Sequence, residues 1–152
     1  MLLLNFKIGK DNYVIDTKDV VEIIPLVNLK TLPGSEPALA GLMNYHSKSV
    51  PVIDLNTLCG QEKVTNTLTT RIILVHYHGD ILGLITSNVS ETVRLEEDAF
   101  KPTGIKAGVN EFLGDIAEHN HQLVQRVILD KLLTTSIRDA LFTSKETSDG
   151  AI

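Results

Sequence analysis

The sequence predicts a mainly β fold built from two similar small units and followed by one C-terminal helix. Strand-like segments separated by turn residues fill the first 130 residues, whereas helical periodicity is confined to the end of the chain. A weak repeat with a spacing of 69 residues relates the Val-x-Glu segments that begin at Val20 and Val89. About five short strands per unit suit a small closed barrel, because closure removes exposed sheet edges. Two such barrels side by side leave a groove that suits ligands or partner helices.

Two hairpins are predicted. In the first, apolar and polar residues alternate over 4–8, and a second strand over 13–15 returns after turn residues at 9–12. The second hairpin spans 71–85, where β-branched residues flank a tight His-Gly-Asp turn. Both segments therefore have the sequence pattern of paired antiparallel strands.

The remaining strands of each unit are expected in the same order. A Val-x-Glu strand follows each hairpin, over 19–24 in the first unit and 88–93 in the second. A closing strand comes later, over 52–55 and 127–130. Each unit is thus predicted to contain a hairpin and the strands that follow it. Chance matches among common Val, Leu and Gly residues are the alternative explanation.

The C-terminal end has the only extended helical pattern. Apolar residues at helical spacing over 132–141 predict an amphipathic helix from Asp130 to about Phe142, with the Asp130 carboxylate as its N-cap. The last residues, 143–152, are polar and are predicted to form a flexible tail.

Composition excludes several classes of protein. Lys and Arg number 14 against 19 Asp and Glu, and this net charge of −5 is unsuited to binding nucleic acid. No apolar run approaches the roughly 18 residues of a membrane span, and the N-terminus lacks the features of a signal peptide. The single cysteine excludes an internal disulfide and fits a reducing compartment, so a cytoplasmic location is expected.

No familiar catalytic motif is present, and the histidines are the strongest candidates for a metal-binding or catalytic site. His76 and His78 alternate on a predicted strand, as do His119 and His121, so each pair is expected to point to one side. Such a pair binds zinc when a third ligand is available. A solvated strand face is the alternative, and we expect no metal, no cofactor and no catalytic residue.

Three other reactive positions have structural explanations. Cys59 has no adjacent base or cation, so it is expected to be a small buried residue rather than a nucleophile. Asp54 follows a strand and is expected to cap a short helical turn that ends at Gly60, not to act as an acid. Glu22 and Glu91 occupy matching places in the two units, which favours one exposed position per unit over a catalytic pair.

A more specific signal lies in the segment 38–55, Ala-Leu-Ala-Gly-Leu-Met-Asn-Tyr-His-Ser-Lys-Ser-Val-Pro-Val-Ile-Asp-Leu. Together with the Asp-Val-Val-Glu-Ile segment at 19–23 and Leu-Pro at 32–33, it resembles the CheW family of chemotaxis coupling proteins. The resemblance covers about 3–133, and the ordered series of motifs is more specific than any one of them.

The resemblance implies two SH3-like five-stranded β-barrel subdomains that share a core, with a C-terminal α-helix. They form one domain over 1–142 in which the two subdomains are interleaved, the first centred on about 17–80 and the second on about 86–130 plus strands from both ends. It also implies a non-catalytic adaptor that couples a methyl-accepting chemotaxis-type receptor to a CheA-like histidine kinase at membrane receptor arrays. In the family a receptor tip docks beside the groove between barrels, and the regulatory domain of the kinase binds barrel to barrel. Self-association through similar contacts is left open.

Ten positions of this chain are assigned from the family pattern, eight of them by a matching residue and Tyr45 and His46 by their place in the motif. The receptor-side positions are Val20, Glu22, Asn44, Tyr45 and His46. The remaining positions belong to the structural core of the motif: Gly41, Val50, Pro51, Asp54 and Leu55.

The chain departs from the family at three places. The usual Asn-Leu-Arg-Gly is Asn-Tyr-His-Ser at 44–47, and a neutral His46 cannot bind a carboxylate through two parallel bonds as Arg does. Ser47 replaces a glycine in a turn that needs positive φ. Thr86 and Ser87 stand where the family has Val-Asp. These differences favour a divergent paralogue in a surface-sensing, pilus or other chemosensory-like pathway.

Other interpretations stay open at this point. A protonated His46 would favour an acidic receptor tip, whereas a solvated loop imidazole has no such role. The chain also fits a detached regulatory domain of a histidine kinase, or a small-ligand or metal-binding β-barrel that uses the four histidines named above.

Overall fold

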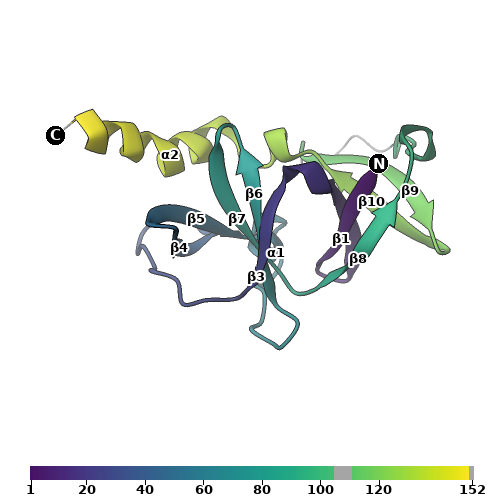
Figure 1. Ribbon diagram of the computed structural model, residues 1–152, viewed down its shortest axis with the longest axis horizontal. Helices are drawn as coiled ribbons and strands as arrows, with labels where there is room; N and C mark the ends of the chain where they lie inside the picture. The colour runs from purple at the N-terminus through teal and green to yellow at the C-terminus, as the bar shows by residue number, and fades with distance from the viewer. Residues whose placement is uncertain (105–110, 151–152) are drawn as a thin grey trace.

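The computed structural model describes residues 1–104 and 111–150, with 143–150 described by their backbone alone. It contains two five-stranded sheets side by side and a C-terminal helix that projects from the body of the molecule (Figure 1). The predicted fold class, two SH3-like subdomains with a shared core, is confirmed. The first sheet has the order β3 (Val20–Pro25), β6 (Arg71–Tyr77), β7 (Asp80–Thr86), β5 (Lys48–Asp54), β4 (Leu39–Tyr45). The second has the order β8 (Val89–Arg94), β1 (Leu2–Ile8), β2 (Asp11–Asp16), β10 (Gln122–Val127), β9 (Leu113–His119).

The internal repeat is visible in these sheets, but the hairpins are exchanged. Strands β3, β4 and β5 of the first repeat have the same places as β8, β9 and β10 of the second. The first sheet, however, is completed by the hairpin β6–β7 of the second repeat, and the second sheet by β1–β2 of the first. In each sheet the exchanged hairpin pairs in parallel, β5 with β7 and β10 with β2. The prediction that each repeat builds its own unit is therefore wrong: the first sheet forms from the contiguous segment 20–86, and the second combines the N-terminal strands with strands from 89–127.

The exchanged hairpins have both faces buried. In β6, Ile73 and Val75 face the core shared by the two subdomains, whereas Ile72 and Leu74 face the interior of the first subdomain. In β1, Leu4, Phe6 and Ile8 enter the shared core and Leu3 enters the interior of the second subdomain. This explains the continuous apolar run of β6, since a strand with two buried faces does not alternate, whereas β1 alternates over residues 4–8.

Short helical segments join the strands. The α-helix α1 covers Leu55–Leu58, and 3₁₀ turns cover Thr17–Asp19 (η1), Glu97–Ala99 (η2) and Leu129–Lys131 (η3). The turn α1 begins directly after Asp54 and is followed by Gly60 with φ of 78°, as the sequence predicted.

The C-terminal helix α2 covers Thr135–Gly150, so both predicted ends need correction. It starts five residues after Asp130, which lies in η3, and the Thr134 hydroxyl accepts a hydrogen bond from the amide of Ile137. The backbone over 143–150, predicted as a flexible tail, is helical because no proline or glycine interrupts it before Gly150. The rings of Phe142 and Tyr77 stack with centroids 6.1 Å apart, which anchors the first part of α2. Within the described ranges, no helix has the length and apolar character needed to span a membrane.

Gly41 in β4 is required by its surroundings. Its φ is 154°, and a Cβ placed there would lie 2.6 Å from the carbonyl oxygen of Lys30. Lys30 exchanges two backbone hydrogen bonds with Leu42, at 2.8 and 2.9 Å, so this carbonyl cannot move away freely. The glycine of the central motif therefore lets the segment before β4 lie directly against the strand.

We expect Gly41→Ala to lower the free energy of unfolding by roughly 3 kcal/mol, because the new methyl group meets a fixed backbone atom in a strained conformation. Gly34→Ala is the matched control, since Gly34 also has positive φ but no atom within 4 Å of the added Cβ. It should cost only about 1 kcal/mol. Urea denaturation of both variants measures the difference, and equal losses would show that the close approach is unimportant.

Candidate partner-binding surface

The β4–β5 hairpin ends in a two-residue turn at His46 and Ser47. Their φ values are 49° and 66°, and Tyr45 pairs with Lys48 to close the turn. Two successive left-handed residues are typical of a type I′ turn, whose twist matches that of the strands it joins. The expectation that Ser47 occupies a positive-φ position is confirmed, and the side chains of both turn residues are exposed.

Tyr45 and Glu22 join the two edges of the first sheet. Strands β3 and β4 are its outermost strands, and the Tyr45 hydroxyl donates a hydrogen bond of 2.7 Å to Oε2 of Glu22. The sheet is thus curled far enough for its edges to meet through side chains. The hydrogen bond to the Glu22 carboxylate raises the pKa of Tyr45 above its usual value.

The local course of β3 places Glu22 on the surface. Pairing of β3 with β6 shifts register between Val20 and Glu22, so Val21 is the extra residue of a bulge. Val21 packs against the core of the first subdomain and Glu22 is exposed. Bulges commonly redirect a side chain in this way.

The five predicted receptor-side residues are only partly brought together. Glu22 contacts Tyr45, and the His46 ring lies edge-on to the Tyr45 ring with centroids 4.3 Å apart. We call Glu22, Tyr45 and His46 the hairpin-tip surface. Asn44 is exposed at the neighbouring strand position, whereas Val20 packs partly against the shared core.

Three of the structural positions of the motif, Val50, Pro51 and Leu55, lie on β5 or at the start of α1. Val50 and Leu55 are buried, in the core of the first subdomain and in the shared core respectively. Pro51 of β5 is paired with Leu42 of β4. The backbone amide and carbonyl of Leu42 point away from β5 and form their hydrogen bonds with Lys30. Proline has no amide hydrogen, but its presence at position 51 therefore costs no hydrogen bond to β4.

Asp54 is the N-cap predicted for α1. Its Oδ1 accepts from the amide of Thr57 at 3.0 Å, and its Oδ2 accepts from the amide of Val64 at 2.9 Å. The side chain is only 6% exposed. Both oxygens therefore hold the polypeptide backbone, which leaves no free carboxylate oxygen for acid catalysis.

Thr86 also has a structural role at its departure from the family pattern. Its buried hydroxyl donates to the carbonyl of Lys7 at 2.6 Å, which links β7 of the first sheet to β1 of the second. A valine at this position cannot make that bond.

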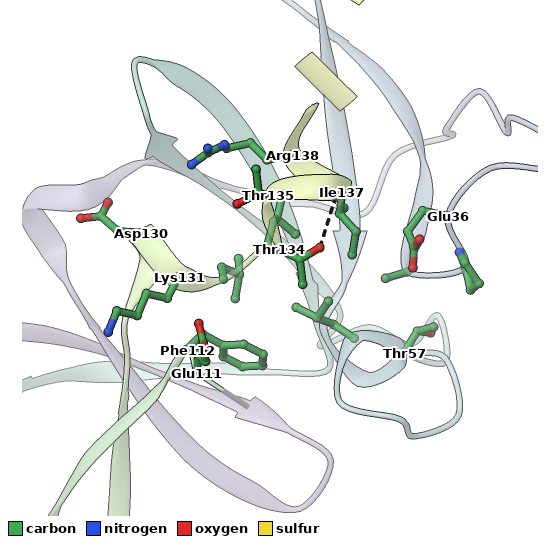
Figure 2. Close-up of a pocket in the computed structure, with 15 residues that line it drawn as sticks. Glu36, Thr57, Glu111, Phe112, Asp130, Lys131, Thr134, Thr135, Ile137 and Arg138 are labelled. Carbon is green, nitrogen blue, oxygen red and sulfur yellow. Dashed lines mark hydrogen bonds between the residues drawn. The ribbon is translucent and has the colours of Figure 1, made fainter. Parts of the chain in front are cut away.

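A groove of about 660 Å³ lies between the two subdomains, beside their shared core. Figure 2 shows Phe112, from the segment before β9, on one side of this space and Ile137 of α2 on another. The sequence predicted a groove between barrels but not these residues, because the apolar spacing over 132–141 indicates an amphipathic helix without indicating what its apolar face contacts. Charged side chains also line the groove: Glu36, Glu111, Asp130, Lys131 and Arg138.

The histidine pairs do not form the predicted arrangement. His78 has φ of 48° and lies in the turn after β6, so it does not share a strand face with His76; its Nε2 lies 3.1 Å from the carbonyl oxygen of Asp130. His121 lies in the turn after β9, with φ of 64°. In the parts of the chain that the structure describes, no three His, Cys, Asp or Glu side chains are grouped closely enough to hold a metal ion.

A second cavity of about 340 Å³ is lined by His76 and by three aspartates, Asp16, Asp19 and Asp130. Burial and the two neighbouring carboxylates raise the pKa of Asp19, although His76 and Lys18 oppose this shift. Cys59 is half-buried, and burial raises the pKa of its thiol, which disfavours a nucleophilic thiolate.

The fold and this surface together define a class of protein. Its members have two SH3-like subdomains on one core, and in this chain the exposed hairpin tip and the groove between the subdomains are candidate binding surfaces. The family model described as CheW-like domain matches residues 2–136, and the chain belongs to this family.

Individual relatives agree with this assignment. The chemotaxis protein CheW of Klebsiella aerogenes is 24% identical over 134 residues, which cover 87% of this chain and 81% of that protein. The chemotaxis protein CheW of Bacillus subtilis is 24% identical over 135 residues, covering 85% and 86%. The crystal structure of scaffolding protein TtCheW from Thermoanaerobacter tengcongensis superposes with a TM-score of 0.81 at 26% identity, over 90% of this chain and 94% of that one.

We expect Ser47→Gly to raise the free energy of unfolding by about 0.5–1 kcal/mol, because glycine adopts the left-handed conformation without steric cost. Ser49→Gly is the control two residues away in β5, where glycine should instead destabilise the strand by a similar amount. Urea denaturation of the two variants checks both signs. A loss of stability in Ser47→Gly would contradict the strain assigned to this turn.

Proposed function

We propose that the chain is a non-catalytic adaptor that couples a methyl-accepting chemotaxis-type receptor to a CheA-like histidine kinase. The observation that carries this proposal is the family match over residues 2–136, and the two-subdomain fold supports it. Relatives bear the names chemotaxis protein and scaffolding protein. The adaptor acts in the cytoplasm and is recruited to membrane receptor arrays.

We further propose that the hairpin-tip surface, with Val20 and Asn44 beside it in sequence, forms the receptor side. Its exposed polar groups and half-buried aromatic ring suit a protein interface, where a few anchors provide affinity and charge selects the partner. His46 in place of the usual Arg removes a fixed positive charge and a bidentate donor. This difference supports a divergent paralogue that serves its own receptor.

The kinase side uses a different part of the molecule. Barrel-to-barrel packing with the regulatory domain of the kinase leaves the hairpin tip free for the receptor. A change confined to the tip therefore affects receptor binding and spares kinase binding. Self-association by similar packing is tested by the mass of the purified protein in solution.

A pull-down from native lysate with the tagged chain tests the class of function. Recovery of a methyl-accepting receptor together with a histidine kinase supports the adaptor role. Recovery of neither, from a lysate that contains both, contradicts it.

We expect Glu22→Lys to abolish co-sedimentation with membranes that carry the cognate receptor, because it reverses the charge of an exposed side chain on the proposed interface. Kinase pull-down and the circular dichroism spectrum should be unchanged. Glu91→Lys is the matched control, since Glu91 is exposed at the corresponding position of β8 in the other repeat. Equal loss in Glu91→Lys, or full sedimentation of Glu22→Lys, would place the receptor elsewhere.

A further inference from the structure

The Glu22 carboxylate has one oxygen held and one oxygen open. The Tyr45 hydroxyl occupies Oε2 at 2.7 Å, and Glu22 is exposed. Among the residues whose side chains the structure describes, 1–104 and 111–142, no group donates a hydrogen bond to Oε1. The carboxylate is thus tethered at one end and turned toward solvent at the other.

The negative charge of Glu22 is not neutralised within the described part of the chain. The two ion pairs found there join the Met1 amino group to Glu96 and Arg126 to Glu97, both in the second subdomain. A tyrosine hydroxyl is neutral and orients a carboxylate without cancelling its charge. A carboxylate only accepts hydrogen bonds, and its strongest partners are cationic donors.

The position of the Tyr45 hydroxyl is set by packing rather than by solvent. The ring packs against the core of the first subdomain, and Tyr45 is the last residue of β4 before the tight turn. Glu22 is therefore ordered when the protein folds, and less conformational entropy remains to be lost on binding. The leucine usual at this position of the family pattern has no hydroxyl and cannot do this.

We propose that Tyr45 is a positioning residue that holds Glu22, and that Oε1 of Glu22 binds a cationic side chain, Lys or Arg, on the receptor tip. This inference rests on the proposed function, because it assigns the partner chemistry of the same surface.

The first test measures affinity for the cytoplasmic hairpin fragment of the receptor recovered in the pull-down. Tyr45→Phe removes only the hydroxyl and should weaken binding about 5- to 10-fold. Tyr13→Phe is the matched control, because Tyr13 is a half-buried tyrosine of β2 in the second subdomain, and its affinity should equal that of the parent. An unchanged affinity in Tyr45→Phe overturns the inference.

A double-mutant cycle separates positioning from direct contact. In the Glu22→Gln background, where the charge is gone, Tyr45→Phe should change the affinity less than about 2-fold. Fully additive losses would mean that Tyr45 contacts the receptor itself, which overturns the positioning role. In the fragment, Lys→Ala or Arg→Ala at the critical tip position should weaken binding to the parent chain but not to Glu22→Gln. If no such position exists, the proposed cation is wrong.

A final measurement needs no partner. In ¹³C-tyrosine NMR, the pKa of Tyr45 should lie above the usual tyrosine value in the parent and fall in Glu22→Ala. An identical pKa in both proteins overturns the hydrogen bond in solution. Failure of the two proposals is distinguishable: if the parent chain binds no receptor fragment, the proposed function fails and this inference with it, whereas binding that Tyr45→Phe leaves intact defeats the inference alone.

Discussion

The parallel pairing of each exchanged hairpin with a strand of the other repeat is the constraint on which the structure depends. Strand β7 pairs with β5 and β2 pairs with β10, and in both sheets the bonded partners are far apart in sequence. The shared core then draws apolar side chains from both hairpins, so the two subdomains cannot separate without exposing the apolar faces of β1 and β6 that fill it. The groove between them is consequently a fixed feature, bounded on both sides by one cooperative core.

A rigid core of this kind allows the exposed turns to vary. Each of the three tight turns after β4, β6 and β9 has at least one non-glycine residue in the left-handed conformation. In each turn, one of these residues is a histidine. Such residues cost stability, and the strands on either side must compensate for them. Proteins that bind through surface loops commonly combine a stable scaffold with variable tips. The departures of this chain from the family pattern include the β4–β5 tip, which agrees with a change of partner on an unchanged scaffold.

Local features of the fold were predictable from the sequence, and non-local ones were not. The hairpins at 4–15 and 71–85 follow from β-branched runs and turn residues, and the cap at Asp54 follows from its place after a strand, since each depends on a few neighbouring residues. The exchange of hairpins depends on pairing between distant strands, on which a repeat in the sequence says nothing. Asp130 and Thr134 are both suitable N-cap residues for the C-terminal helix. Because Asp130 lies in the 3₁₀ turn η3 at 129–131, the helix starts only after Thr134.

At the candidate surface, too, the residues were predictable from the sequence but the contact between them was not. Glu22 and Tyr45 were both assigned to the receptor side from their places in the motif, but their hydrogen bond arises because the two edges of the first sheet meet when it curls. A closed barrel converts two distant strand positions into neighbours, and the sequence contains no local signal for that contact. A substitution at the turn can therefore change the position of Glu22 on β3, because Tyr45 contacts both the His46 ring and the Glu22 carboxylate. The Tyr-His-Ser of this chain and the family's usual Leu-Arg-Gly therefore differ in two linked ways: Tyr45 orients the Glu22 carboxylate, and His46 lacks the fixed positive charge of the arginine. A receptor matched to this chain should therefore carry a complementary cation rather than the carboxylate that an arginine would bind.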